Sequence, residues 1–199
     1  KNDDYTSLRS RAEGELDKEV FKDSEKLRLQ ACEKWFDVRA FGQLFAFKGG
    51  TAKGLSLGIR GPVSIHSAFS LDPVNISTIQ ITKSVNSEGD GTAKGSDTMG
   101  SKHRVDFGLY TFAGSINPQL ATKTGFSDDD AEVIKKAIIN MFQNDASSAR
   151  PEGSMEMVKL YWWKHDNPNG QYSAAKVHRS VDISLKDGVR DPKDFTDYN

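Results

Sequence analysis

The sequence predicts an α+β fold, because helical and strand patterns both occur along one chain. Residues 127–142 carry apolar side chains at the spacing of a helix with one buried face. Residues 24–36 show a similar spacing. Residues 76–85 and 105–112 instead alternate in the manner of β-strands. The chain has 199 residues, which is enough for one sizeable core.

Composition excludes several classes of protein. Lys and Arg number 27 against 28 Asp and Glu, so the net charge is −1 and any anion site must be a local patch. Hydrophobic residues make up 36% and the mean hydropathy is −0.59, which predicts substantial exposed loops. The single cysteine, Cys32, excludes an internal disulfide and is expected to be a small core residue. With no apolar run long enough to cross a membrane, we expect a cytoplasmic protein without membrane contact.

The first part of the chain is predicted to hold one helix after a charged arm. Residues 1–23 are strongly charged and poorly periodic, so we expect a solvated helix or a mobile arm. A helix should begin at Ser24, which can cap it. Trp35 and Phe36 are expected to anchor this helix in the core.

Two short polar segments follow this helix. Asp37 and Arg39 would share one side of an extended backbone, but would not face each other in a helix. Residues 48–54 resemble a phosphate-binding P-loop, yet they lack the Lys and Ser/Thr that must follow the last glycine. We therefore expect a flexible glycine loop carrying Lys53, and later a turn with Arg60 at its tip.

The middle of the chain is predicted to form a long hairpin over roughly residues 79–110. Its loop at 86–98 has no large apolar residue, and we expect it to be disordered in the free protein. The strand at 105–112 reads as buried on both faces. Three groups that can meet phosphate stand at the mouth of that strand: Lys102, His103 and Arg104.

The second half should contain one well-defined helix. Ser127 caps residues 127–143, and Asp130 completes a capping box. The expected buried stripe of this helix is Ala131, Ile134, Ala137, Ile138, Met141 and Phe142. The remaining expectations are a surface connection at 115–125, a strand at 154–164 and an edge strand near 177–183.

No catalytic or metal-binding pattern emerges from the residues. None of the four histidines has a His or Cys partner at zinc-like spacing, so we expect no metal and no cofactor. Trp162 and Trp163 should point to opposite faces of their strand. One of them could stack on a base, although the core is favoured for both.

Five short segments, taken together in their order, carry a resemblance to a known family. They are Asp37-Val-Arg-Ala-Phe-Gly42, Arg60-Gly-Pro62, Thr98-Met-Gly-Ser-Lys-His103, Gly108-Leu-Tyr110 and Lys123-Thr-Gly-Phe-Ser127. Over roughly residues 33–165 the chain resembles the backbone subunit of CRISPR Cascade surveillance complexes, with type I-C as the most similar form. The resemblance implies a modified RNA-recognition-motif (ferredoxin-like) core without a catalytic role. It also implies that several copies, with other Cascade subunits, polymerise along one guide RNA that pairs with target DNA.

The resemblance also implies which residues meet the guide. Four of them stand at motif positions: Arg39, Arg60, Lys102 and His103. Charge and loop position add four further candidates: Lys53, Lys83, Lys94 and Arg104. We expect one domain over 1–199 with an inserted thumb-like hairpin at 79–104, which in the family kinks the guide. Family members begin with a strand that is not found ahead of Lys1, so we expect the domain to lack it.

Two other functions compete with this hypothesis. A related backbone subunit of RNA-targeting complexes cuts RNA with a loop aspartate and a metal ion, for which Asp90 and Asp97 are candidates. A domain that binds no nucleic acid is the third possibility, and the near-neutral net charge is its best support.

Overall fold

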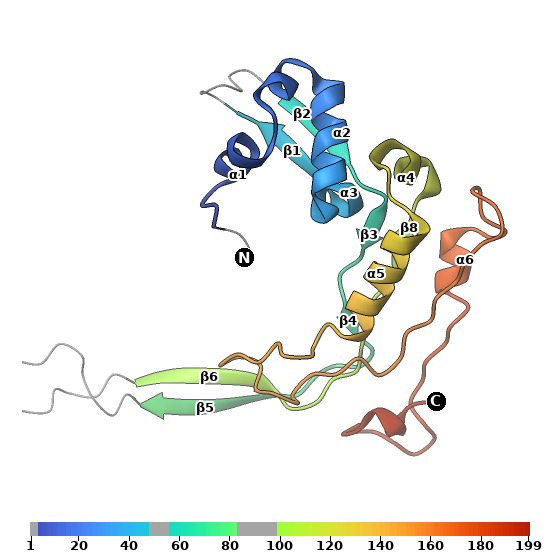
Figure 1. Cartoon of the computed structure of the whole chain (residues 1–199). Coiled ribbons are helices and arrows are strands. Elements are labelled where there is room, and N and C mark those ends of the chain that lie inside the picture. Colours follow the sequence, from blue (N-terminus) through green and yellow to red (C-terminus); the bar gives the residue numbers. More distant parts are fainter. Residues whose placement is uncertain (1–3, 48–55, 83–98) are drawn as a thin grey trace, which may run out of the picture. The chain divides into compact units, whose positions relative to one another are not determined.

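Helices and small antiparallel sheets give this chain an α+β fold, as predicted (Figure 1). The computed structural model describes residues 4–47, 56–82 and 99–199. The chain divides into two compact units, of which the first combines Lys1–His66 with Ala113–His178 and the second combines Ser67–Phe112 with Arg179–Asn199.

The first unit begins with three helices and a short 3₁₀ turn. They are α1 (Leu8–Glu15), the turn η1 (Lys18–Lys22), α2 (Ser24–Lys34) and α3 (Phe36–Phe41). The cap of α2 is Asp23 rather than Ser24, because its carboxylate accepts hydrogen bonds from the Glu25 and Lys26 amides. Leu27, Ala31, Cys32 and Trp35 are all buried, as predicted for this helix.

The charged arm expected at residues 1–23 is instead part of the core. Ala12, Leu16, Val20 and Phe21 are buried and pack in one cluster with α2. These four are spread over a helix and a 3₁₀ turn, so no single period brings them onto one face. Because the apolar residues follow no regular period and lie among many charged residues, their burial could not be predicted from the sequence.

A hairpin covers part of this cluster. Strands β1 (Gly42–Ala46) and β2 (Ser56–Arg60) pair antiparallel, with Gly42 opposite Arg60. Phe45 of β1 is fully buried and stacks on Trp35, with 6.2 Å between ring centroids. Arg60 is the last residue of β2, so the turn expected around it is wrong.

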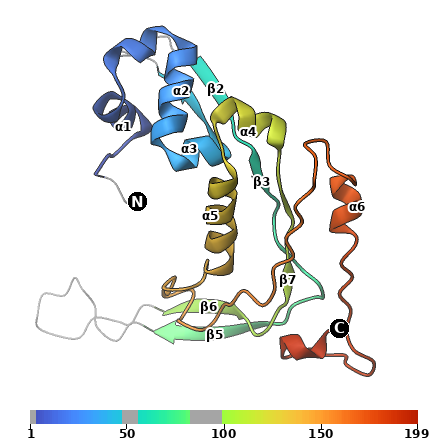
Figure 2. The same ribbon diagram turned by 45° about the vertical axis from the view of Figure 1, so that its right-hand side comes forward.

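The rest of the first unit is built around a second, smaller core. The elements at this core are β3 (Val63–Ile65), β8 (Gly114–Ile116), α4 (Pro118–Thr124) and α5 (Asp128–Ile139). The short helix α6 (Ala174–His178) belongs to the same unit and has no buried residue. β3 pairs with β8, and α5 lies alongside β3, since Val63 and Ile134 belong to one buried cluster (Figure 2).

Three predictions for this region need correction. Residues 115–125 form β8 and α4, because Asn117 caps that helix and Pro118 occupies its first turn. Residues 154–164 have no strand, and α6 replaces the strand expected near 177–183. An alternating pattern makes a strand only when a partner supplies hydrogen bonds.

The helix predicted from Ser127 is confirmed at its start. The Ser127 hydroxyl accepts from the Asp130 amide, and the Asp130 carboxylate accepts from the Ser127 amide. The expected stripe is only partly right. Ile134 is buried, Ala131 and Ile138 are half-buried in the same cluster, and Ala137 and Met141 are exposed. The helix also ends at Ile139, earlier than expected.

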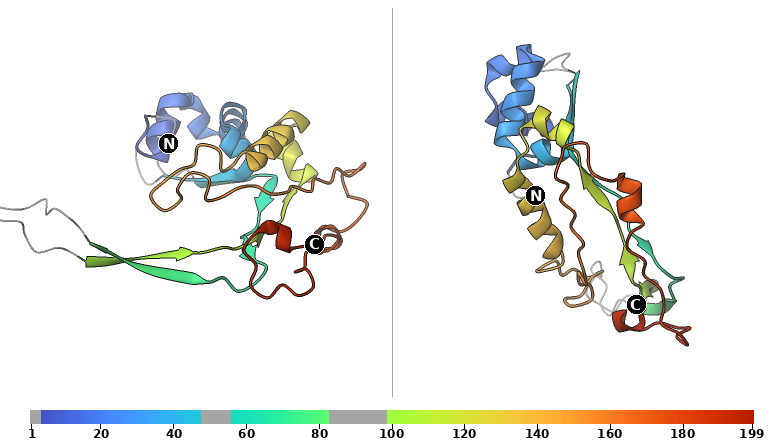
Figure 3. Two further views of the ribbon diagram at one scale, coloured as in Figure 1. Left: turned by 90° about the horizontal axis from the view of Figure 1, so that it is seen from below. Right: turned by 90° about the vertical axis from the view of Figure 1, so that its right-hand side faces the viewer.

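The second unit is dominated by one hairpin. Strands β5 (Ile76–Thr82) and β6 (Met99–Val105) form a long antiparallel ribbon (Figure 3), and β4 (Phe69–Ser70) pairs with β7 (Tyr110–Thr111). The hairpin pairing agrees with the sequence prediction. The strand buried on both faces does not, because β6 is exposed throughout and β7 has only two residues.

The carboxyl-terminal segment is tied to the same unit. The Tyr198 hydroxyl donates to Asp72 at 2.8 Å, Tyr198 also bridges to Leu185, and the 3₁₀ turn η2 (Phe195–Asp197) lies between them in sequence. Burial and this hydrogen bond raise the pKa of Tyr198 to about 12. The described strands of both units form four two-stranded sheets, so an RNA-recognition-motif core remains a proposal.

Two glycines allow α3 to approach the turn between β2 and β3. Gly42 ends α3 with a φ of +84°, and a Cβ there would lie 2.2 Å from the Ile59 carbonyl oxygen. A Cβ on Gly61 would lie 2.3 Å from the carbonyl oxygen of Ala40. Both belong to segments that carry the family resemblance, and both have a structural reason to be glycine.

We expect Gly42→Ala and Gly61→Ala to lower the free energy of unfolding by about 1–3 kcal/mol each, because both force backbone to move. Gly58→Ala is the matched control, since its Cβ would meet only a Leu44 methyl group at 4.0 Å. Urea unfolding of the three variants checks this, and equal stabilities would show that the close approach is not rigid.

Candidate nucleic-acid interface

The register of the β5–β6 hairpin sorts its side chains onto two faces. Residues opposite each other in an antiparallel pair point to the same side, and neighbours along a strand point to opposite sides. The isoleucine face therefore consists of Ser77, Ile79, Ile81, Gly100, Lys102 and Arg104. The histidine face consists of Ile76, Thr78, Gln80, Thr82, Met99, Ser101, His103 and Val105.

The cationic cluster predicted from the sequence is thus divided. Lys102 and Arg104 lie on the isoleucine face, and His103 lies on the other. Side chains alternate between the two faces all along β6 (Met99–Val105), so the sequence spacing of these three residues already predicts the division. Lys102 and Arg104 can therefore meet one ligand together, His103 faces the other side, and contact of each with guide RNA stays a prediction.

On the isoleucine face, cations stand next to exposed apolar groups. Lys102 is opposite Ile79, which is 47% exposed, and Ile81 is 50% exposed. Arg104 is opposite Ser77 and donates from Nε to Asp106 at 3.1 Å. Hydrogen bonds from Ser77 first, and then from Arg104, lower the pKa of Asp106. The Arg104 side chain stays 62% exposed, so its guanidinium is accessible to a further anion.

The histidine face is held by polar cross-strand contacts. His103 Nδ1 lies 2.9 Å from the Thr78 hydroxyl directly opposite it. The Gln80 amide donates to the Met99 sulfur at 2.9 Å. This face therefore offers a hydrogen-bonded imidazole rather than a pair of permanent charges.

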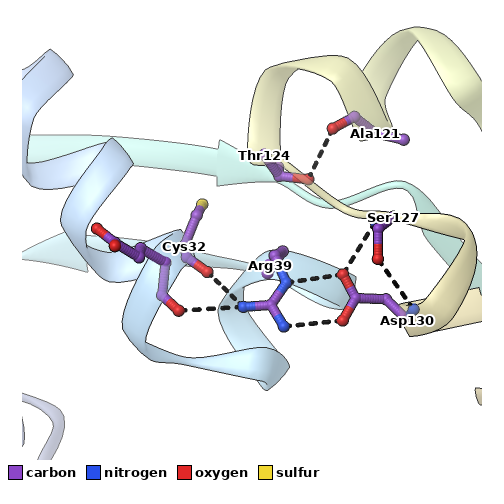
Figure 4. Close-up of polar contacts among 7 residues, drawn as sticks. Cys32, Arg39, Ala121, Thr124, Ser127 and Asp130 are labelled. Carbon is purple, nitrogen blue, oxygen red and sulfur yellow. Dashed lines mark hydrogen bonds and ion pairs between the residues drawn. The ribbon is translucent and has the colours of Figure 1, made fainter. Parts of the chain in front are cut away.

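Arg39 lies at a very different kind of site, inside the first unit (Figure 4). Its Nε and Nη2 donate to the two carboxylate oxygens of Asp130, at 2.9 and 2.8 Å. Its Nη1 donates to the Cys32 and Glu33 carbonyl oxygens at the end of α2. The two ionised side chains are only 20% and 12% exposed. Arg39 therefore joins the last turn of α2 to the first turn of α5.

The electrostatics of this pair are mutually supportive. The hydrogen bonds between Arg39 and Asp130 lower the pKa of Asp130 and raise the pKa of Arg39. Burial raises the pKa of the neighbouring Cys32 thiol, which confirms Cys32 as a core residue. The geometry gives Arg39 a structural role, and its predicted contact with guide RNA stays a prediction.

Asp37 does not pair with Arg39, because residues 36–41 are helical. It binds Arg11 instead, with 2.8 Å between Nη1 and Oδ2, and this hydrogen bond lowers the pKa of Asp37. The Arg11 guanidinium also lies over the Trp35 ring at 4.3 Å from its centroid. Both residues thus fasten α1 to α3.

Several predicted residues cannot be placed in this interface. Arg60 is exposed at the end of β2, in the other unit from the hairpin. Five candidate residues and a loop fall outside the described residues: Lys53, Lys83, Lys94, Asp90, Asp97 and residues 86–98. Within residues 4–47, 56–82 and 99–199, no three His, Cys, Asp or Glu side chains gather closely enough to hold a metal. No helix in the described part is long and apolar enough to span a membrane.

We expect Asp130→Asn to lower the free energy of unfolding by about 1.5–3 kcal/mol, because it removes the buried, charged partner of Arg39. Asp128→Asn is the matched control in the same helical turn. Its side chain is 87% exposed and pairs with Lys164 at the surface, so its loss should cost little. Denaturant unfolding compares the two, and equal losses would contradict a special role for Asp130.

The pair also predicts an acid dependence. The folded pKa of Asp130 lies below its ordinary value of 3.8, so its contribution is complete above that value and is lost as pH falls through the folded pKa. The melting-temperature difference between the parent and Asp130→Asn should therefore be constant at neutral pH and shrink below about pH 4. A difference that persists unchanged in strong acid would show that the carboxylate charge is not what stabilises the fold.

No curated protein matches this chain. The sequence model of the family described as CRISPR-associated protein Cas7 matches residues 1–199. This family implies a CRISPR RNA-binding backbone subunit that assembles with other effector subunits, which does not fit a domain without nucleic acid. The chain belongs to the CRISPR-associated Cas7 family.

Proposed function

We propose that this chain is the guide-RNA-binding backbone subunit of a type I Cascade complex, of a form similar to type I-C. Several copies polymerise along one guide RNA, and the guide pairs with target DNA between the points where the subunits hold it. The family match and the five motif segments support this proposal. The single observation that carries it furthest is the isoleucine face of the β5–β6 hairpin.

The exposed isoleucines of this face suggest that a ligand covers it. A lone two-stranded hairpin is marginally stable in water, and here apolar β-branched side chains are exposed on it. Lys102 and Arg104 are two residues apart on one strand, so both can meet phosphates of one strand of RNA. Ile79 and Ile81 then lie beside the sugars and bases. We therefore assign the hairpin the role of the thumb that contacts and kinks the guide.

The proposal gives the remaining cations different roles. Arg39 serves the scaffold first, because its guanidinium is engaged by Asp130 and by the end of α2, and its contact with guide RNA remains a prediction of the resemblance. The other candidate guide contacts remain Arg60, His103, Lys53, Lys83 and Lys94. A non-catalytic subunit, one RNA-recognition-motif-like domain over 1–199 and a cytoplasmic location remain predictions of the same proposal.

We expect Lys102→Gln and Arg104→Gln each to weaken binding of single-stranded RNA by about 1.5–3 kcal/mol, because a charge-assisted phosphate contact is lost. The slope of log K against log salt should become smaller by about 0.7 for each contact removed. Binding should depend little on RNA sequence, because phosphates are the same in every sequence. Fluorescence anisotropy at several salt concentrations measures all three effects.

Lys22→Gln is the control for bulk charge, since Lys22 is an exposed lysine of the first unit that pairs with Glu19. It should leave RNA affinity and its salt slope nearly unchanged. An equal loss in the Lys22 variant, or no loss in the hairpin variants, would remove the isoleucine face from guide binding.

A further inference from the structure

Residues 159–163 present two kinds of surface in alternation. Leu160 and Trp162 are half-buried, and Trp162 packs against the second core of the first unit. Lys159, Tyr161 and Trp163 are exposed on alternate positions. The sequence favoured a core position for both tryptophans, yet Trp163 is 47% exposed.

The three exposed side chains form one ordered stack, here called the aromatic ladder (Lys159, Tyr161 and Trp163). The Tyr161 and Trp163 rings are nearly parallel, with 22° between their planes and 5.9 Å between their centroids. The Lys159 ammonium lies 5.2 Å from the centroid of the Tyr161 ring. The Tyr161 ring therefore contacts both the Lys159 ammonium and the Trp163 indole.

The ladder is not explained by packing within the chain. Tyr161 is 43% exposed, so both rings keep a large part of their area in water. Aromatic rings stabilise a protein or a complex mainly through the area that they bury, so exposed rings add little to the stability of the free chain. Contact between the two rings holds them nearly parallel, and the indole of Trp163 stays partly exposed. The indole is therefore preorganised to stack on a further ring.

The chemistry of the ladder selects a nucleobase as its ligand. Every base offers a flat π face, so any base can stack on the exposed indole of Trp163. Lys159 at the other end can meet a phosphate of the same strand. In a double helix each base is already stacked between its neighbours, so only an unpaired base can stack on this indole.

We propose that the aromatic ladder is a stacking site for an unpaired base of single-stranded nucleic acid. It adds base contact to the phosphate contacts of the hairpin, and it rests on the proposed function only in that the chain must meet nucleic acid. The strand could be guide RNA or single-stranded DNA. Both share the same base chemistry, and the test separates them.

The test measures binding of the full chain to short oligouridine RNA and oligothymidine DNA, each with and without abasic positions. Trp163→Ala should weaken binding of the intact strand by about 5- to 100-fold and leave binding of the fully abasic strand unchanged. Trp163→Phe should restore part of the loss, because a smaller ring still stacks. The strand that shows the loss, RNA or DNA, identifies the source of the base.

Met155→Ala is the matched control, because Met155 is 44% exposed and precedes the ladder in the same extended segment. It should change neither affinity. Each variant is first shown to melt like the parent, so that a change in affinity is not a change in folding.

The outcomes separate this inference from the proposed function. If the parent binds both strands with salt dependence and Trp163→Ala changes nothing, the ladder does not stack on bases while the hairpin proposal stands. An equal loss on intact and abasic strands also overturns the stacking site. If the parent binds neither strand, the proposed function fails, and the ladder inference fails with it.

Discussion

The ion pair between Arg39 and Asp130 is the contact on which the first unit depends. Arg39 satisfies carbonyl groups at the end of α2, where the helix dipole is negative, and Asp130 stands in the first turn of α5, where it is positive. Each charge therefore suits the helix end that it meets. Arg39 stands in α3 between Val38, which belongs to the cluster around Leu27, and Ala40, which belongs to the cluster around Ile134. The two cores of this unit are joined by a polar contact that hydrophobic burial alone would not position.

Sequence reasoning succeeded where the signal was local. The α5 start was predictable because Ser127 and Asp130 are three residues apart and cap each other. The role of Arg39 was not, because its partner lies 91 residues away in the chain. Its predicted contact with guide RNA came from the family resemblance, and the local sequence around Arg39 gives no sign of so distant a carboxylate. Likewise, residues 154–164 alternate as a strand would, yet none of the strands in the described part of the chain pairs with them.

The hairpin illustrates a prediction that was right in outline and wrong in detail. The pairing of β5 with β6 follows from two alternating segments separated by a polar loop. The same alternation places Lys102 and Arg104 on one face of the hairpin and His103 on the other. The isoleucine face then combines two permanent charges with exposed apolar groups, while the histidine face holds an imidazole bonded to Thr78. The division gives each face a different chemistry on one ribbon.

A net charge of −1 limits how this chain can hold nucleic acid. Long-range attraction to phosphates requires positive charge, and here it can come only from local groups such as Lys102 and Arg104. Affinity from phosphates falls as salt rises, whereas stacking of a base on Trp163 requires no counterion release. A subunit with no excess of cations therefore gains from a second kind of contact that is equally tolerant of sequence. Phosphate contacts and stacking both read features common to every nucleotide, which is what a protein that holds guides of any sequence requires.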